Sequence, residues 1–273
     1  MRSAVARSEQ QHGEGDLKHI AAEGLQGDVI GIPVHVGSMH SALAQVAQWS
    51  RRRESRSVFF CNAHSLAHAR SHRSFQQVLE SADLRLPDGA PVAYMLRRVG
   101  FEDQKRVCGP DLMLQYFALA EEREESVFLY GSTPPTLERL VARCAADFPR
   151  LKVHVYSPPF RALSSDEDEA IVKMISDSGA STVWVALGCP KQENWIAEHR
   201  NRIPAVLLGV GAAFAFHAGV ISRAPEWMQK AGLEWLHRLV SDPARLWKRY
   251  LLTNSSFIFY SVLSALRGQR LRG

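Results

Sequence analysis

The chain has 273 residues, of which 46% are hydrophobic, enough for one large domain or for one domain with an appendage. Its four cysteines stand far apart and form no CxxC pair, which argues against a zinc site or a disulfide framework and favours a reducing cytosol. The net charge of +5 is uneven, because the residues from 237 onward carry seven basic side chains and one acidic one. A basic tail of this kind is typical of contact with nucleic acid, anionic lipid or phosphorylated substrates.

Residues 1–27 are polar and contain no apolar run of the signal-peptide type, so we expect a disordered leader. From residue 28 onward, apolar runs alternate with segments of helical period. Strands are predicted at 29–36, 57–61, 83–86, 126–130, 152–156, 182–187 and 205–208, and helices at 38–49, 65–80, 90–99, 110–122, 134–147, 166–178 and 190–200. Runs such as VFLY and TVWVAL are apolar throughout, as strands buried on both faces are. The alternation predicts an α/β fold over residues 28–225: a Rossmann-like, mostly parallel sheet with helices on both faces.

Residues 226–273 are predicted to form a helical, basic C-terminal appendage, because the sequence after Ala224 has no strand signal. Asp242 followed by Pro243 is typical of a helix start. The apolar segment 250–266 is interrupted by Thr, Asn and Ser and is shorter than the roughly 20 residues that a bilayer span requires. Two interpretations stay open: a helix lying on the membrane surface with basic flanks, or a helix packed on the core with a solvated basic face.

Small or polar residues follow five of the predicted strands. In an open parallel sheet, ligands bind beyond the carboxyl ends of the strands, and helix N-termini at that edge suit a diphosphate. The alternative for each of these positions is ordinary turn chemistry. The candidate residues are Asn62, Asp88, Gly131, Ser132, Lys191, Gln192, Gly209 and Gly211.

Several other kinds of site lack their sequence signals. GxGxxG, GxxxxGK[ST], GxSxG and HExxH are all absent, and a dinucleotide-dependent oxidoreductase would need the first of these. His64, His68 and His72 share one helix face by their spacing, but no carboxylate or cysteine accompanies them at ligand spacing, so we predict no metal site. The acidic run at 166–168 has the form DxD, yet its place at the start of a predicted helix is explained by capping.

Asp88 lies in the tripeptide Pro87-Asp88-Gly89, which by local chemistry is a turn. The same position at a strand end would hold a carboxylate rigidly for chemistry. An ordinary carboxyl group is already ionised at pH 7, so we expect Asp88 to act as a base without a large pKa shift. The tripeptide alone does not distinguish the two roles.

Seven longer motifs occur in order along the chain: NAHS, SADLRLPDGAPVAY, RVCGPDLM, FLYGSTP, LGCPKQENWI, LLGVGAAFAFHAG and RAPEWMQKAGLEWLHRLVSDPARLWKRYL. This ordered set resembles the WecG/TagA/CpsF glycosyltransferase family, over residues 28–252. The resemblance implies a hexosyltransferase that moves a sugar from a UDP-sugar, with inversion, onto a polyprenyl-diphosphate-linked saccharide in cell-surface polysaccharide biosynthesis. It also implies work without a metal or other cofactor, at the cytoplasmic face of the plasma membrane.

The resemblance also assigns roles to residues. It makes Asp88 the general base, places Asn62 beside the donor sugar, and puts Arg106 and Gln192 in the pocket wall. The basic appendage would associate with the membrane and bring positive charge to the diphosphates. The matching basic positions are Arg238, Arg245, Lys248 and Arg249.

Two departures from the family pattern bear on the donor. Phe60 stands where many relatives carry threonine, and Ala215 stands where many carry aspartate. The donor is therefore open among a UDP-hexose, UDP-N-acetylmannosamine and its uronic acid. A non-catalytic nucleotide-sugar-binding or scaffold subunit of a polysaccharide assembly complex is the alternative function. Apolar surface on the appendage would suit a membrane, a partner in a homo-oligomer, or both in turn. Nucleic acid is not an expected partner, although a nucleic-acid module would also explain a basic tail.

Overall fold

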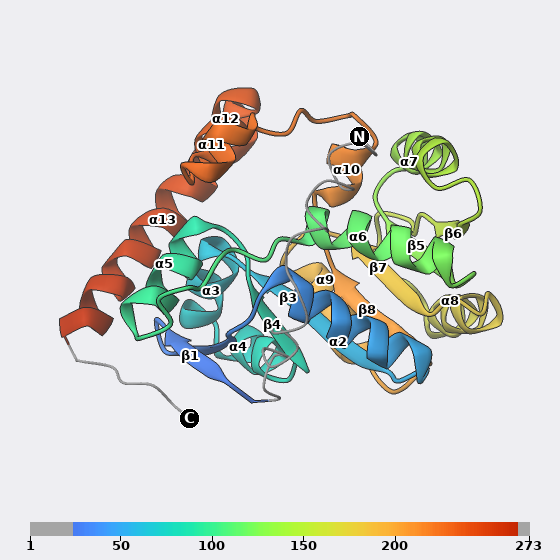
Figure 1. Ribbon diagram of the computed structural model, residues 1–273, viewed down its shortest axis with the longest axis horizontal. Helices are drawn as coiled ribbons and strands as arrows, with labels where there is room; N and C mark the ends of the chain where they lie inside the picture. Colours follow the sequence, from blue (N-terminus) through green and yellow to red (C-terminus); the bar gives the residue numbers. More distant parts are fainter. Residues whose placement is uncertain (1–23, 267–273) are drawn as a thin grey trace, which may run out of the picture.

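The computed structural model describes residues 24–266. It contains a six-stranded parallel sheet with the strand order β4-β3-β8-β7-β5-β6, which confirms the predicted fold class (Figure 1). The strands are β3 (Arg56–Cys61), β4 (Leu84–Pro87), β5 (Ser126–Gly131), β6 (Lys152–Tyr156), β7 (Thr182–Ala186) and β8 (Val206–Gly209).

The sheet divides the apolar interior into two cores. Successive side chains of a strand point to opposite faces, so Phe59 and Cys61 of β3 enter one core while Val58 and Phe60 enter the other. The first core is covered by α3 (Ala63–Ser71), α4 (Arg73–Glu80), α5 (Ala90–Arg98), α8 (Ser165–Asp177) and α9 (Lys191–His199). The second is covered by α2 (Met39–Arg51), α6 (Gly109–Glu122), α7 (Pro134–Asp147) and α10 (Ala213–His217).

Two predicted elements differ from the structure. The predicted strand 29–36 is an antiparallel hairpin of β1 (Gln26–Val29) and β2 (Ile32–His35). Its turn residues Ile30 and Gly31 both have positive φ, 52° and 86°. A β-branched residue rarely adopts that conformation, which is why the apolar run masks the turn. The hairpin starts at Gln26, before the predicted boundary at residue 28, and the rest of the predicted leader, residues 1–23, lies outside the described chain. The predicted helix 65–80 is broken at His72, whose backbone is extended.

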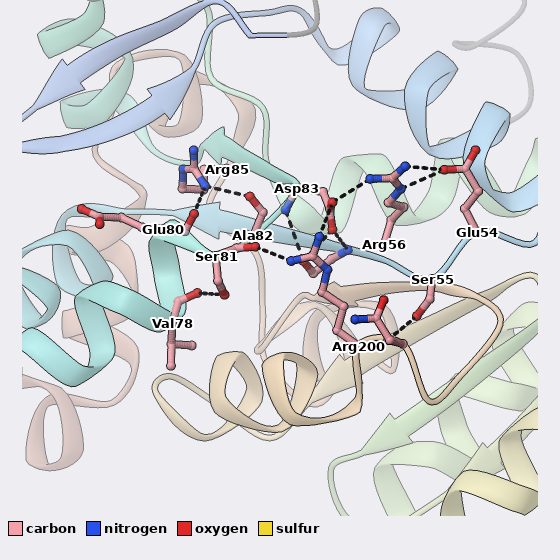
Figure 2. A network of polar contacts seen from close by, with 12 residues as sticks. Glu54, Ser55, Arg56, Val78, Glu80, Ser81, Ala82, Asp83, Arg85 and Arg200 are labelled. Atoms are coloured by element: carbon pink, nitrogen blue, oxygen red, sulfur yellow. Dashed lines mark hydrogen bonds and ion pairs between the residues drawn. The ribbon is translucent and has the colours of Figure 1, made fainter.

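Polar side chains hold the start of the edge strand β4, at the end of the sheet opposite the candidate site. Figure 2 shows the Asp83 carboxylate between Arg56 and Arg200, which donate to it at 3.0 and 2.8 Å. The buried Arg85 donates to the carbonyl groups of Ala82 and Pro33, both at 2.7 Å, so the hairpin is tied to β4. These contacts fix the start of β4, the strand that ends beside Asp88.

The C-terminal part of the described chain is helical, with α11 (Glu226–Lys230), α12 (Glu234–Ser241) and α13 (Pro243–Leu266). Helix α13 lies along α3 (Figure 1), with Phe257 buried in the first core and Arg70 over the ring of Tyr260 at 5.4 Å. The same helix leaves Ile258 and Phe259 more than 60% exposed. The burial of Phe257 agrees with the interpretation of a helix packed on the core. Contact of the exposed apolar side chains with a membrane stays a prediction. Within residues 24–266, no helix has the length and apolar character required to cross a bilayer.

Candidate active site

A cleft of about 2000 Å³ lies at the carboxyl ends of the parallel strands, the edge where ligands bind in such sheets. Its floor comes from the ends of β3, β4, β7 and β8, and one wall comes from the appendage helices α12 and α13. The structure thus brings residues from distant parts of the chain to one place. The predicted site residues that line the cleft are Asn62, Asp88, Arg106, Ser132, Lys191, Gln192, Gly209, Gly211 and Arg238.

Asp88 is held by its backbone directly after β4. Its N–H donates to the Cys61 carbonyl at 2.8 Å, and the Val107 N–H donates to the Pro87 carbonyl at 2.8 Å. Gly89 follows with φ 90° and starts helix α5, so the tripeptide does form the turn. The turn leaves the Asp88 side chain in the cleft wall. One residue therefore has the geometry that both the structural and the chemical role require.

The pKa of the Asp88 carboxyl is raised to about 7, well above the ordinary value expected from the sequence. Burial is the largest cause, and the negative charge of Glu234 adds to it. The positive charges of Arg106 and Arg238 and a hydrogen bond from Asn62 act in the opposite direction. A carboxyl group with a pKa near 7 can both accept and release a proton at neutral pH.

Asn62 is oriented by the first turn of α3. Its Oδ1 accepts the Ser65 N–H at 3.1 Å, and Ser65 Oγ accepts the Asn62 N–H at 3.0 Å, which forms a capping box. With Oδ1 used in the cap, the NH₂ of the amide is the part of Asn62 that can interact with Asp88, and this interaction lowers the pKa of the Asp88 carboxyl. The motif-matched asparagine therefore lines the cleft and favours the ionised form of Asp88.

Arg106 is bound by the appendage. Its guanidinium group donates to Glu234 Oε2 at 2.7 Å and to Gln229 Oε1 at 2.8 Å. Glu234 also lies 3.8 Å from Arg223, which pairs with Asp111. The network joins the loop before α6 to helices α11 and α12. Sequence reasoning missed Glu234, Gln229 and Arg223, since no pattern relates Arg106 to an acid 128 positions away.

Backbone conformation brings β5 close to β7 at the rim. Gly131 has φ 107°, and a side chain there would come within 2.7 Å of the Ala186 carbonyl oxygen. Ser132 has φ 64°, an unusual conformation for a residue with a side chain, and its N–H donates to the same carbonyl at 3.0 Å. Gly131 thus makes the close approach possible, and Ser132 is the residue of the pair that lines the cleft.

Gln192 is buried where two loops meet. Its Oε1 accepts the Gly188 N–H at 3.2 Å, and its Nε2 donates to Glu193 Oε1 at 3.0 Å. Side chains on Gly209 or Gly211 would come within 3.2 and 3.5 Å of the Gln192 amide. These two glycines therefore make space for Gln192, while Lys191 next to it is exposed.

The predicted basic positions of the appendage are described only in part. Arg238 lines the cleft, with its guanidinium group over the Phe216 ring at 5.5 Å. Arg245, Lys248 and Arg249 fall on α13, but their side chains lie outside the described part of the chain.

The remaining sequence candidates have structural roles. The His64 and His68 rings stack with centroids 6.3 Å apart, and the His72 ring lies tilted against His68 at 4.1 Å. Among the described residues, no group of three or more side chains is suited to a metal ion. In the acidic run 166–168, Glu167 completes a capping box with Ser164, which confirms the capping interpretation.

Comparison of the sequence with known proteins shows which family the chain belongs to. The sequence matches the glycosyl transferase WecG/TagA/CpsF family over residues 27–271. It is 33% identical over 180 residues to a Bacillus subtilis (strain 168) protein named N-acetylglucosaminyldiphosphoundecaprenol N-acetyl-beta-D-mannosaminyltransferase, covering 66% of this chain and 68% of that one. A protein of the same name from Bacillus spizizenii is 35% identical over 178 residues, covering 65% and 67% of the two chains. The chain therefore belongs to the WecG/TagA/CpsF family and is a glycosyltransferase.

Proposed function

We propose that the protein moves a sugar from a UDP-sugar, with inversion, onto a saccharide linked to a polyprenyl diphosphate. The names of the two Bacillus relatives specify an acceptor of this class, which supports it here. The observation that carries the proposal is Asp88, a carboxyl group with a pKa of about 7 fixed at a strand end in the cleft.

In the proposed reaction the ionised Asp88 accepts the proton of the acceptor hydroxyl while that oxygen attacks the anomeric carbon. The new C–O bond forms as the bond from that carbon to the diphosphate oxygen breaks, and UDP leaves with the electron pair. Attack opposite the leaving group inverts the anomeric centre. A base whose pKa lies near the working pH is ionised in a useful fraction of the molecules and is still a strong enough proton acceptor.

Charge on the departing diphosphate is proposed to be offset by guanidinium groups, without a metal ion. Arg106 and Arg238 both lie close enough to lower the pKa of Asp88, and guanidinium suits bidentate contact with phosphate oxygens. Arg106 is paired with Glu234, so a diphosphate would compete for its donors or share them. We expect EDTA to leave the transfer rate unchanged.

The donor sugar is left among three classes. Phe60 and Ala215 both line the cleft, so the two departures from the family pattern fall where a donor would contact the protein. The relatives' names give an N-acetylmannosaminyl group, and a hexose or a uronic acid would also fit the reaction. A donor panel must therefore include all three.

The test is a donor screen. Purified full-length protein is mixed with a short-chain polyprenyl-diphosphate saccharide and each UDP-sugar, and UDP release is measured for the wild type, Asp88→Asn and the surface control Glu138→Gln. Acceptor-dependent release from one donor, lost only in Asp88→Asn, is expected. If Asp88→Asn still releases UDP, Asp88 only forms the turn and is not the base.

A folded wild type that releases no UDP from any donor, yet binds UDP-sugars, would instead support the non-catalytic scaffold. The same samples with and without EDTA test the absence of a metal.

A further inference from the structure

Part of the cleft wall is made of large apolar side chains that remain accessible. They come from three helices and are 40–62% exposed: Tyr94 on α5, Trp235 on α12, and Ile258 and Val262 on α13. We call these four residues the apolar wall. Large apolar side chains that gather in a concave site and stay uncovered are typical of a place where an apolar ligand binds.

The fold joins the apolar wall to the proposed base. Asp88 lies two residues before α5, and a side chain on Gly232 would come within 2.7 Å of the Ala90 Cβ, so the start of α12 packs against the start of α5. Arg238 follows Trp235 by three positions on α12, and both side chains line the cleft. The positive charge of Arg238 lowers the pKa of Asp88, so this guanidinium group lies near the base. A ligand that reaches the base and Arg238 therefore has the apolar wall beside it.

The composition of the wall favours the acceptor over the donor. The described residues that α5 and α13 contribute to the cleft carry no charge: Ala90, Pro91, Tyr94 and Met95 on α5, and Asn254, Phe257, Ile258, Ser261 and Val262 on α13. A UDP-sugar carries two phosphates and many hydroxyl groups, which an apolar surface leaves without partners. The proposed acceptor differs, because a diphosphate joins its saccharide to a long hydrocarbon chain. Burial of that chain against apolar side chains is favourable.

We propose that the apolar wall binds the first isoprene units of the acceptor's polyprenyl chain, next to the diphosphate. The inference rests on the proposed function and deepens it by assigning a subsite for the chain. The groups then follow one another in the order that the acceptor requires: its hydroxyl at Asp88, its diphosphate near Arg238 and its chain on the apolar wall. This subsite belongs to the cleft of the protein itself, so it recognises a prenyl chain without a bilayer.

The test compares two soluble ligands that share a diphosphate and differ in chain length. Binding of dimethylallyl diphosphate, with one isoprene unit, and farnesyl diphosphate, with three, is measured by calorimetry without lipid and below the concentration at which micelles form. The full-length wild type should bind farnesyl diphosphate at least about tenfold more tightly. Burial of about two CH₂ groups already accounts for a tenfold ratio.

Ile258 and Phe259 provide a matched pair of variants. They are neighbours on α13 with exposed fractions of 62% and 63%, and of the two it is Ile258 that lines the cleft. Ile258→Gln should reduce the ratio of the two affinities at least about threefold, and adding Val262→Gln should reduce it further. Phe259→Gln should keep the wild-type ratio. All variants should keep the wild-type Kd for UDP, which shows that they are folded.

Several results would overturn the subsite. These are equal affinity of the wild type for the two prenyl diphosphates, an unchanged ratio in Ile258→Gln with Val262→Gln, or an equal reduction in Ile258→Gln and Phe259→Gln. The last result would mean adsorption on apolar surface in general. If the double variant stops self-associating in sedimentation velocity and keeps the ratio, a second copy of the chain covers the wall instead. If the double variant does not fold, Tyr94→Ser replaces it, and an unchanged ratio there has the same meaning.

The donor screen distinguishes this inference from the proposed function. Chain-dependent binding that requires Ile258, in a protein that releases no UDP from any donor, would support the subsite and contradict the proposed reaction. Acceptor-dependent UDP release by a protein that binds both prenyl diphosphates equally would support the reaction and remove the subsite.

Discussion

At the scale of single residues, Asp88 lowers the stability of the folded protein at neutral pH. Its carboxyl pKa is about 7 in the folded protein against 3.8 as an ordinary side chain. The folded state therefore favours the protonated form. The resulting loss of stability is absent below about pH 4, grows between pH 4 and 7, and is complete above pH 7. A group placed for proton transfer is in this case a group that weakens the fold at neutral pH.

We predict that Asp88→Asn is more stable than the wild type at pH 8, by up to about 4 kcal/mol, since each unit of pKa shift corresponds to about 1.4 kcal/mol. The difference should shrink at pH 5 as Asp88 in the wild type becomes protonated. Urea unfolding at the two pH values measures it. A variant equally or less stable than the wild type at pH 8 would contradict the assigned pKa shift.

At the scale of elements, the appendage completes the site instead of merely adjoining it. Glu234 of α12 binds Arg106, and Gly232 approaches the start of α5 so closely that a side chain would come within 2.7 Å of the Ala90 Cβ. The negative charge that raises the pKa of Asp88 thus comes from outside the α/β domain. The position of α12 is therefore coupled to the protonation of the proposed base.

The second prediction follows from this coupling. Glu234→Gln removes a negative charge and releases Arg106, and both changes lower the pKa of Asp88. Since the base acts when ionised, the acidic limb of the pH profile of kcat/KM should move to lower pH, by roughly half a unit or more. Glu226→Gln, an exposed acid of α11 outside the cleft lining, is the control and should leave the profile in place. If the acidic limb of the pH profile does not move in Glu234→Gln, the appendage does not control the pKa of Asp88.

The elements also show which features the sequence predicts and which it does not. Strands β5 and β7 were predictable because strands buried on both faces are apolar throughout, and the strand-end residues were predictable because parallel strands end at one edge. The hairpin was missed because Ile30 adopts a conformation that its side chain disfavours. Glu234 was missed because its contact with Arg106 arises only when distant segments pack. Ile258 lay within the predicted helical appendage, but its place in the cleft wall is a property of the folded chain.

At the scale of the whole molecule, apolar surface and positive charge are concentrated at the appendage. Val240 on α12 is 73% exposed, and Leu251, Ile258 and Phe259 on α13 are each more than 60% exposed. The chain from residue 237 carries seven basic residues against one acidic. A segment that combines exposed apolar side chains with a basic sequence suits an anionic membrane surface. We propose that this end of the molecule contacts the membrane that holds the acceptor lipid.

The third prediction tests this orientation. Wild-type protein should sediment with phosphatidylglycerol vesicles and less with neutral phosphatidylcholine vesicles. Phe259→Glu should bind the anionic vesicles at least about tenfold more weakly, because it loses apolar burial and adds repulsion. Met174→Glu, at a 42% exposed position on α8, is the control. Equal sedimentation of Phe259→Glu, or tighter binding to duplex DNA than to anionic vesicles, would contradict a membrane role.

The tryptophans are divided between the two parts of the molecule. Those of the α/β domain are at most 8% exposed, and those of the appendage are at least 40% exposed: Trp49, Trp184 and Trp195 in the first group, Trp227, Trp235 and Trp247 in the second. Intrinsic fluorescence therefore contains two separable signals. Docking on vesicles should shift only the red-emitting component toward the blue. Trp195, stacked on Tyr130 in the cleft wall, should respond to nucleotide, and so should Trp235 of the exposed group, which also lines the cleft. An unlabelled sample thus carries its own optical reporters for both events.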